Sequence, residues 1–335
     1  MLTACIIARD EAEFLPDCLK SIYQLTDDII LIDTGSVDRT PDIARNCGCK
    51  VVEFPWQDDF SAARNYALQH ATGEWILAID ADERLHVQMS QTELDALLST
   101  TDAKAFKAVI VSYIGPESTH ESLFSDERIV LFRNDPHVRF HHRVHEDLSE
   151  SLYRRYGTNV KISRLPMTIE HLGYLDFIVE RRHKHQRNIR LLELEIKENG
   201  ESPWVNYCLG VEWSSCKCWD KALQPLQRVM EQAIGTPYWT LAAYTLAYGF
   251  LHLKMPQKCI EVCEQVLRVE GELHTEFSLL KLTANWQTYS SIAELLKASL
   301  CHALRSPEDY YAFVLAYQKL VQRIGNDDLT WNGTE

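Results

Sequence analysis

Short apolar runs alternate with segments of helical periodicity through the first part of the chain. Apolar runs bounded by turn residues predict strands, and apolar positions three or four apart predict helices. The predicted strands are 2–8, 28–32, 50–54 and 75–79, and the predicted helices are 11–25, 42–47 and one that begins near Asp59 or Ser61. Such alternation favours a parallel sheet, and we therefore expect an α/β domain with ligands at the carboxyl ends of its strands.

Two further apolar segments follow in the middle of the chain. Residues 105–114 alternate weakly and residues 128–132 are apolar, so both predict strands, which we expect to flank the sheet. The polar segment 115–127 between them predicts a loop that could close over a substrate.

Helical periodicity continues from Asp176 onward. Residues 177–197 predict one long helix that joins two domains, and its charged stretch 181–185 is predicted to be a solvated face. The expected domains are an α/β domain over 1–174, a connecting helix over 175–200 and a helical domain over 201–325.

The helical domain contains an internal repeat. The leucines at 209, 246 and 280 recur at intervals of 37 and 34 residues, and a small residue follows each of them by thirteen positions, at Ala222, Cys259 and Ala293. This spacing indicates helix pairs of the tetratricopeptide (TPR) type. We expect about three pairs closed by a helix over 308–321, in a short solenoid with a concave face.

Carboxylates follow two of the predicted strands. Asp80 and Asp82 come after the fourth strand, and if the chain stays extended there, both side chains point to one face and can reach one Mg²⁺ or Mn²⁺. The alternative is an acidic loop that caps the next helix. Asp33 follows the second strand, where it can form a turn or accept hydrogen bonds from a base or a ribose.

Basic side chains and histidines supply further candidates. Arg64 and Asn65 lie on the helix before the fourth strand, and a ligand role is open for either. The segment 137–147 holds four histidines, but their spacing fits no common zinc pattern and no cysteine joins them. This segment is either a functional cluster or a solvated loop. Arg128 and Arg133 either contact a diphosphate or face solvent.

Composition limits the class of protein. The 335 residues include 34 Lys and Arg against 48 Asp and Glu, and the net charge of −14 argues against a nucleic-acid or anionic-membrane surface. The sequence has no run of eighteen apolar residues, and its ten cysteines fall mostly in apolar periodic segments. We expect a cytoplasmic protein with reduced thiols and no stable membrane insertion.

Three ordered motifs carry a family resemblance. They are Ile-Ala-Arg-Asp-Glu at 7–11, Ile-Ile-Leu-Ile-Asp-Thr-Gly-Ser at 29–36 and Ala-Ile-Asp-Ala-Asp at 78–82. Together they resemble the nucleotide-sugar half of an inverting family 2 glycosyltransferase of the GT-A fold. The resemblance covers roughly the first half of the chain.

A more particular string narrows the resemblance. Trp56, Asp59, Phe60, Ser61, Arg64 and Asn65, with Phe-Arg at 132–133 and Val-His-Glu at 144–146, are similar to the subgroup that has a TPR tail. That subgroup includes the sublancin-type peptide S-glycosyltransferases, which glycosylate cysteines of bacteriocin precursors. This chain departs from them by starting directly at the first strand and by a shorter helical tail, so the identity of the acceptor stays open.

The resemblance implies a mixed GT-A sheet flanked by helices and followed by a TPR-like domain. It implies a nucleotide-sugar site made of Ala8, Arg9, Glu11, Asp33, Arg64, Asn65, Asp80, Ala81 and Asp82. Asp33 would contact the uracil or ribose, and the two later aspartates would bind Mg²⁺ or Mn²⁺, with His145 or His171 as a further ligand. Glu146 would be the general base, and His145 and Arg133 would act beside it.

The implied activity is metal-dependent inverting transfer of a hexose, with glucose as the expected sugar, from a UDP-sugar. The acceptor would be a peptide Cys, Ser or Thr, or alternatively a saccharide or lipid-linked glycan of the cell envelope. The helical domain would bind the acceptor or form a homodimer. The rival hypothesis is a TPR scaffold without catalysis, and the intact pair Asp80 and Asp82 favours the enzyme.

Overall fold

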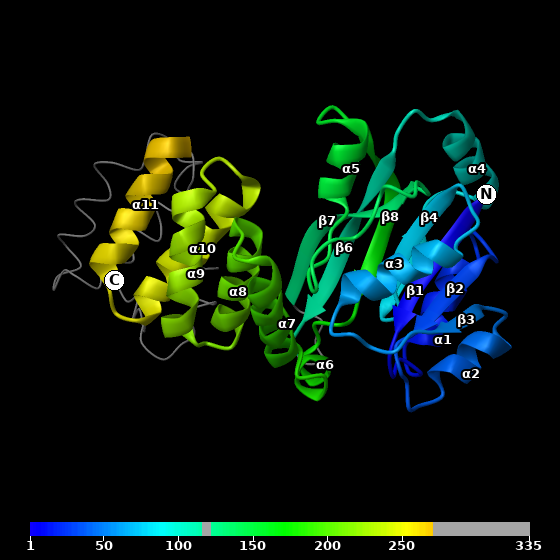
Figure 1. Ribbon diagram of the computed structural model, residues 1–335, viewed down its shortest axis with the longest axis horizontal. Helices are drawn as coiled ribbons and strands as arrows, with labels where there is room; N and C mark the ends of the chain where they lie inside the picture. The colour runs from blue at the N-terminus through cyan, green and yellow to red at the C-terminus, as the bar shows by residue number, and fades with distance from the viewer. Residues whose placement is uncertain (116–121, 271–335) are drawn as a thin grey trace, which may run out of the picture. The chain divides into compact units, whose positions relative to one another are not determined.

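The computed structural model of the protein describes residues 1–115 and 122–270, and its helices and strands are drawn in Figure 1. The strands are β1 (Leu2–Ala8), β2 (Ile29–Asp33), β3 (Lys50–Glu53), β4 (Trp75–Asp80), β5 (Glu83–Val87), β6 (Ala105–Ile114), β7 (Ser122–Arg133) and β8 (Ile162–His171). The helices of the first 200 residues are α1 (Leu15–Ile22), α2 (Thr40–Asn46), α3 (Phe60–His70), α4 (Gln91–Thr100), α5 (Ser149–Tyr156), α6 (Asp176–Arg181) and α7 (Lys184–Asn199). The helices that follow are α8 (Pro203–Ser215), α9 (Trp219–Gln232), α10 (Pro237–His252) and α11 (Pro256–Glu270). The chain divides into a first unit, Met1–Glu195, and a second unit that begins at Ile196.

The first unit is built on one eight-stranded sheet, ordered β3-β2-β1-β4-β7-β6-β8-β5. The strands from β3 to β4 are parallel, and β7 is antiparallel to both β4 and β6. The predicted mixed sheet flanked by helices is therefore confirmed. The expectation that the two later strands flank the sheet was wrong, because both lie inside it. Strand β7 also begins at Ser122, so much of the predicted loop 115–127 is strand.

Helices cover both faces of the sheet (Figure 1). Alternate residues of β1, such as Ala4 and Ile6, pack in one core with α1, α2 and α4, while Cys5 belongs to the core on the other face with α3 and α5. This alternation follows from the period of two along a strand. Burial on both faces explains why the parallel strands are continuous apolar runs.

The first helix is shorter than predicted. It begins at Leu15 and not at residue 11, because the preceding backbone is bound by the loop after β2. The N–H of Glu11 donates to Thr40 Oγ1 at 2.7 Å, and the N–H of Ala12 donates to Asp38 Oδ2 at 3.1 Å. Side chains of this loop thus fix the residues that follow β1.

The predicted long helix over 177–197 is two helices. Helix α6 ends at Arg181, and α7 starts at Lys184 after His183, whose φ is 45°. The first unit extends through Glu195, so most of the predicted connecting segment belongs to this unit.

The second unit repeats a helix pair. Moving α8 and α9 along the sequence by 37 residues places them on α10 and α11, and Ala222 and its counterpart Cys259 are both fully buried. A Cβ on Gly210 would lie 2.4 Å from Cγ of Leu226, so glycine allows α8 to approach α9 closely. The predicted third copy, with Leu280 and Ala293, and the helix over 308–321 lie outside the described residues.

Two expectations from composition concern the cysteines and the membrane. The nine cysteines within 1–115 and 122–270 are free thiols. Within the same ranges, every helix is too short or too polar to cross a membrane.

Candidate active site

The carboxyl ends of three parallel strands meet at one edge of the sheet. Ala8 is in register with Asp33, and Ile7 is in register with Asp80. Asp33 is buried, and its Oδ1 accepts a hydrogen bond of 3.0 Å from the N–H of Ser36. The structure therefore brings the three predicted strand ends together.

Asp80 and Asp82 do not share an extended strand. Strand β4 ends at Asp80, and Ala81 and Asp82 form a turn before β5. The expectation that both side chains point to one face depended on an extended chain, and this turn removes that condition. The two carboxylates instead bind different arginines.

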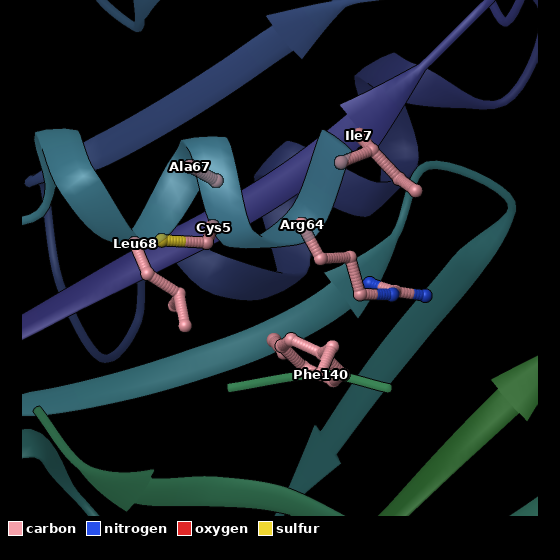
Figure 2. Close-up of a pocket in the computed structure, with 7 residues that line it drawn as sticks. Cys5, Ile7, Arg64, Ala67, Leu68 and Phe140 are labelled. Atoms are coloured by element: carbon pink, nitrogen blue, oxygen red, sulfur yellow. The ribbon is translucent and has the colours of Figure 1, made fainter. Parts of the chain in front are cut away.

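Arg64 binds Asp80. It lies on α3, whose N-cap is Asp59, and its Nη2 donates to Asp80 Oδ1 at 2.7 Å. Its Nε donates to Glu146 Oε1 at 2.5 Å, and its guanidinium lies 5.4 Å from the ring centroid of Phe140 (Figure 2). One buried arginine thus joins a strand-end aspartate to the predicted base.

A second arginine supports Asp80. Arg128 Nη1 lies 3.6 Å from Asp80 Oδ2, and Arg128 Nη2 donates to both oxygens of Glu83, at 2.8 and 2.7 Å. Burial alone would raise the pKa of Asp80, but Arg64 and Arg128 hold that pKa well below its usual value. Asp80 is therefore an ionised carboxylate.

Arg182 binds Asp82. Its Nη1 donates to Asp82 Oδ2 at 2.8 Å, and its Nη2 donates to Glu11 Oε2 at 2.7 Å. Burial and the charge of Asp82 raise the pKa of Glu11, Arg182 opposes both, and the net pKa is about 8. The prediction that residues 181–185 form a solvated face was therefore wrong for Arg182.

His171 lies beside Asp82. Its Nε2 is 3.7 Å from Asp82 Oδ1, and its Nδ1 is 3.2 Å from Ser112 Oγ. A Cβ on Gly173 would lie 2.5 Å from His171 Nε2 and 2.6 Å from Asp82 Oδ2, so only glycine fits against this pair. Burial raises the pKa of Asp82, whereas His171 and Arg182 lower it. The net effect is a pKa below its usual value.

The donor atoms of Asp82 and His171 suit a divalent cation. Within the described residues, no group of three His, Cys, Asp or Glu side chains is arranged to hold a metal ion. Mg²⁺ usually takes one or two protein carboxylates, and substrate phosphates and water complete its shell. The pair therefore fits an ion that binds together with a diphosphate, provided that Arg182 releases Asp82.

Asn65 holds the segment that carries the predicted base. Its Nδ2 donates to the carbonyl oxygen of Phe140, and its Oδ1 accepts from the N–H of Phe140, both at 2.9 Å. The side chain thus binds backbone. Further along this segment, His145 has a φ of 56°, next to Glu146.

One predicted residue is not brought to this edge. Arg133 is in register with Trp75, at the opposite end of β4 from Asp80, and five residue steps of a strand span about 17 Å. Its guanidinium lies 4.3 Å from the Trp75 ring centroid. Arg9 follows Ala8 at the edge itself, where its side chain is exposed and its one ion pair in the described parts is to Asp10 at 4.0 Å.

A family model matches the sequence of most of this sheet domain. Residues 3–158 match the sequence model described as glycosyl transferase family 2. Most of the first unit therefore resembles family 2 glycosyltransferases in sequence.

Several named proteins are similar in sequence to this chain. A TPR repeat-containing protein of Synechococcus elongatus is 38% identical over 213 residues, covering 62% of this chain and 51% of that protein. The glycosyltransferase SunS of Bacillus subtilis is 32% identical over 211 residues, covering 61% and 47%. An uncharacterized glycosyltransferase of Rickettsia bellii is 31% identical over 107 residues, covering 32% and 36%. The chain therefore spans about half the length of the first two relatives, or less.

Proposed function

We propose that the protein is a metal-dependent inverting glycosyltransferase that moves a hexose from a UDP-sugar to an acceptor. The observation that supports this proposal best is that Asp33, Asp80 and Glu146 come together within the residues that match family 2, at strand ends where sheets of this kind bind ligands. Glucose is the first sugar to test. A cytoplasmic location is part of the same hypothesis.

The donor would bind along the strand ends. Asp33 uses Oδ1 for the turn at Ser36, which leaves Oδ2 to accept a hydrogen bond from the uracil or ribose. Asp82 and His171 would hold Mg²⁺ or Mn²⁺, which when bound supplies positive charge opposite the diphosphate. Arg128 adds a fixed positive charge at the same edge.

Glu146 would remove the proton of the acceptor. Arg64 holds Oε1, so Oε2 is the oxygen that takes the proton. As the acceptor atom bonds to the anomeric carbon, the bond from that carbon to the diphosphate breaks, and its electron pair leaves with the diphosphate. Attack from the face opposite the leaving group inverts the anomeric centre.

The acceptor would be a peptide side chain of Cys, Ser or Thr. The support is the relation to SunS and the repeated helix pairs of the second unit, an architecture that forms extended binding surfaces. A saccharide or lipid-linked glycan is the other acceptor class. The alternative roles of the second unit are to form a homodimer or to bind partners in a scaffold without catalysis.

Mass spectrometry of peptide and glycan acceptors incubated with a panel of UDP-sugars tests this proposal. We expect a hexose mass on an acceptor in the presence of Mg²⁺ or Mn²⁺, and none with Asp82→Asn. Asp102→Asn, an exposed substitution outside the site, is the matched control. No transfer and no UDP binding under any metal would favour the scaffold.

A further inference from the structure

A buried carboxylate of α7 binds the segment that carries Glu146. Glu195 is 4% exposed, and its Oε1 accepts a hydrogen bond of 2.6 Å from His142 Nδ1. Its Oε2 accepts a hydrogen bond of 2.8 Å from the backbone N–H of Arg143. A carboxylate can only accept, so the Nδ1 of His142 carries the proton. The two oxygens of Glu195 thus hold two adjacent residues, one through its side chain and one through its backbone.

These two residues belong to a closed loop, which we call the 142–146 loop. His141 and Asp147 exchange backbone hydrogen bonds of 3.0 and 3.2 Å at its base. Within it, His142 has a φ of 74° and His145 a φ of 56°, in a region that residues with a Cβ rarely adopt. A backbone of this kind persists when surrounding contacts hold it in place.

Further contacts to this loop come from α3 and the residues just before it. The N–H of Phe60 donates to the carbonyl oxygen of Arg143 at 2.8 Å, and Arg143 Nη1 donates to the carbonyl oxygen of Asp58, also at 2.8 Å. Arg64, on α3, donates a hydrogen bond to Glu146 at the end of the loop. Glu195 holds the loop from a segment more than fifty residues further along the chain.

We propose that Glu195 is a positioning residue that sets the 142–146 loop so that Glu146 faces the acceptor. This inference rests on the proposed role of Glu146 as base. Helix α7 does not depend on Glu195 for its own attachment, since Leu191 and Leu192 are buried and Arg190 pairs with Asp58. Loss of Glu195 therefore releases the loop and leaves the helix in place.

Kinetics of three variants test this role. We expect Glu195→Ala to lower kcat for transfer about tenfold to a hundredfold, since small misplacement of a catalytic group has effects of this size. KM for the UDP-sugar and the Kd for UDP should stay within about twofold, because the loop is not part of the nucleotide site. Glu195→Gln keeps an oxygen for the Arg143 N–H and should recover part of kcat. Asp102→Asn, which removes an exposed ion pair with Lys161 away from the loop, should change kcat by less than about twofold.

Hydrogen exchange measured by mass spectrometry tests the same role without activity. Glu195→Ala should speed exchange over 141–147, with unchanged exchange in β1 and β4. If Glu195→Ala does not fold, His142→Asn removes the same contact from the other side. Because the two residues act through one contact, the double variant Glu195→Gln with His142→Asn should lose no more kcat than the worse single variant. Unchanged exchange over 141–147 would overturn the positioning role. The same holds if kcat falls only in variants that also lose UDP affinity and have a lower thermal midpoint. Faster exchange in a protein that neither binds UDP nor transfers a sugar would support the contact between Glu195 and the 142–146 loop but overturn the proposed function.

Discussion

Two arginines at the strand ends each bridge two carboxylates. Arg64 joins Asp80 to Glu146, and Arg182 joins Asp82 to Glu11. Asp80 and Asp82 are two residues apart in one motif, yet they end in separate networks. We call these the Arg64 network and the Arg182 network.

The two networks differ in how firmly each arginine is held. Arg64 lies inside α3, its side chain is 9% exposed, and Phe140 packs against its guanidinium. Arg182 follows the last residue of α6, its side chain is 23% exposed, and the next residue has a left-handed backbone. We infer that the Arg64 network is the more rigid of the two. The Asp80 side chain is 26% exposed and that of Asp82 is 8% exposed, so a ligand that binds Asp82 must displace Arg182.

Arg64→Met should have the largest effect, because it removes the arginine of the first network. It leaves Asp80 and Glu146 without their shared partner, and removing one side of a buried ion pair costs about 3–5 kcal/mol of unfolding free energy. Urea denaturation measures this loss, and sugar transfer should be abolished. Arg45→Met, which removes an exposed ion pair, is the control and should cost about 1 kcal/mol or less. A loss for Arg64→Met no larger than that of the control would show that the network does not stabilise the fold.

Asparagine substitutions separate the two aspartates. Asp82→Asn should remove the rise in thermal midpoint that UDP with Mn²⁺ gives the wild type, since the carboxylate that binds the ion is gone. Asp80→Asn should keep part of that rise but lower the unfolding free energy by about 1–3 kcal/mol, because Arg64 loses a charged acceptor. The opposite assignment of the two effects would place the metal on Asp80.

Arg182→Gln should open the second network. Arg182 and a divalent cation compete for Asp82, so removing the positive charge should strengthen Mn²⁺ binding without nucleotide by about tenfold. Electron paramagnetic resonance of free Mn²⁺ measures this binding. Arg182→Lys keeps the charge and is the control. Equal Mn²⁺ affinity in wild type and Arg182→Gln would mean that the arginine does not compete with the ion.

The smallest expected effects concern pH, and they have opposite signs in the two networks. The pKa of Glu11 is raised to about 8, so the folded protein binds more protons than the unfolded chain above pH 4.5, and stability falls as pH rises toward 8. The pKa of Asp80 is lowered, so its contribution is present above pH 3.8 and is lost as pH falls through the folded value. Glu11→Gln should flatten the alkaline limb by about 1–2 kcal/mol in unfolding experiments from pH 5 to pH 8.5. An unchanged limb would exclude Glu11 as its source.

The sequence predicted the elements and strand ends well because these follow from local periodicity. Ala8, Asp33 and Asp80 end apolar runs, and parallel strands bring such ends together whatever the loops do. The helix pairs were predicted because the same spacing occurs twice in the described part of the second unit.

Side-chain partners far apart in sequence could not be predicted in the same way. Arg182 pairs with groups 100 and 171 positions away, and no periodicity records such a pairing. Arg133 was misplaced because the motif that contains it does not say at which end of β7 an arginine lies. Glu195 could have been noticed from the sequence alone. It lies at helical spacing on the same face of α7 as Asn188, Leu191 and Leu192, and a charged residue is unusual on a buried face.

Helix α7 determines where the first unit can be separated from the rest of the chain. The helix runs from Lys184 to Asn199, past the last residue of that unit. A protein truncated after residue 174, the domain end expected from sequence, would lack Arg182 and Glu195 and would leave Glu11, Asp82 and His142 without these partners. The shortest fragment that keeps both sets of contacts and the whole of α7 ends at residue 199, and we expect limited proteolysis to cut after that point and not within 175–199.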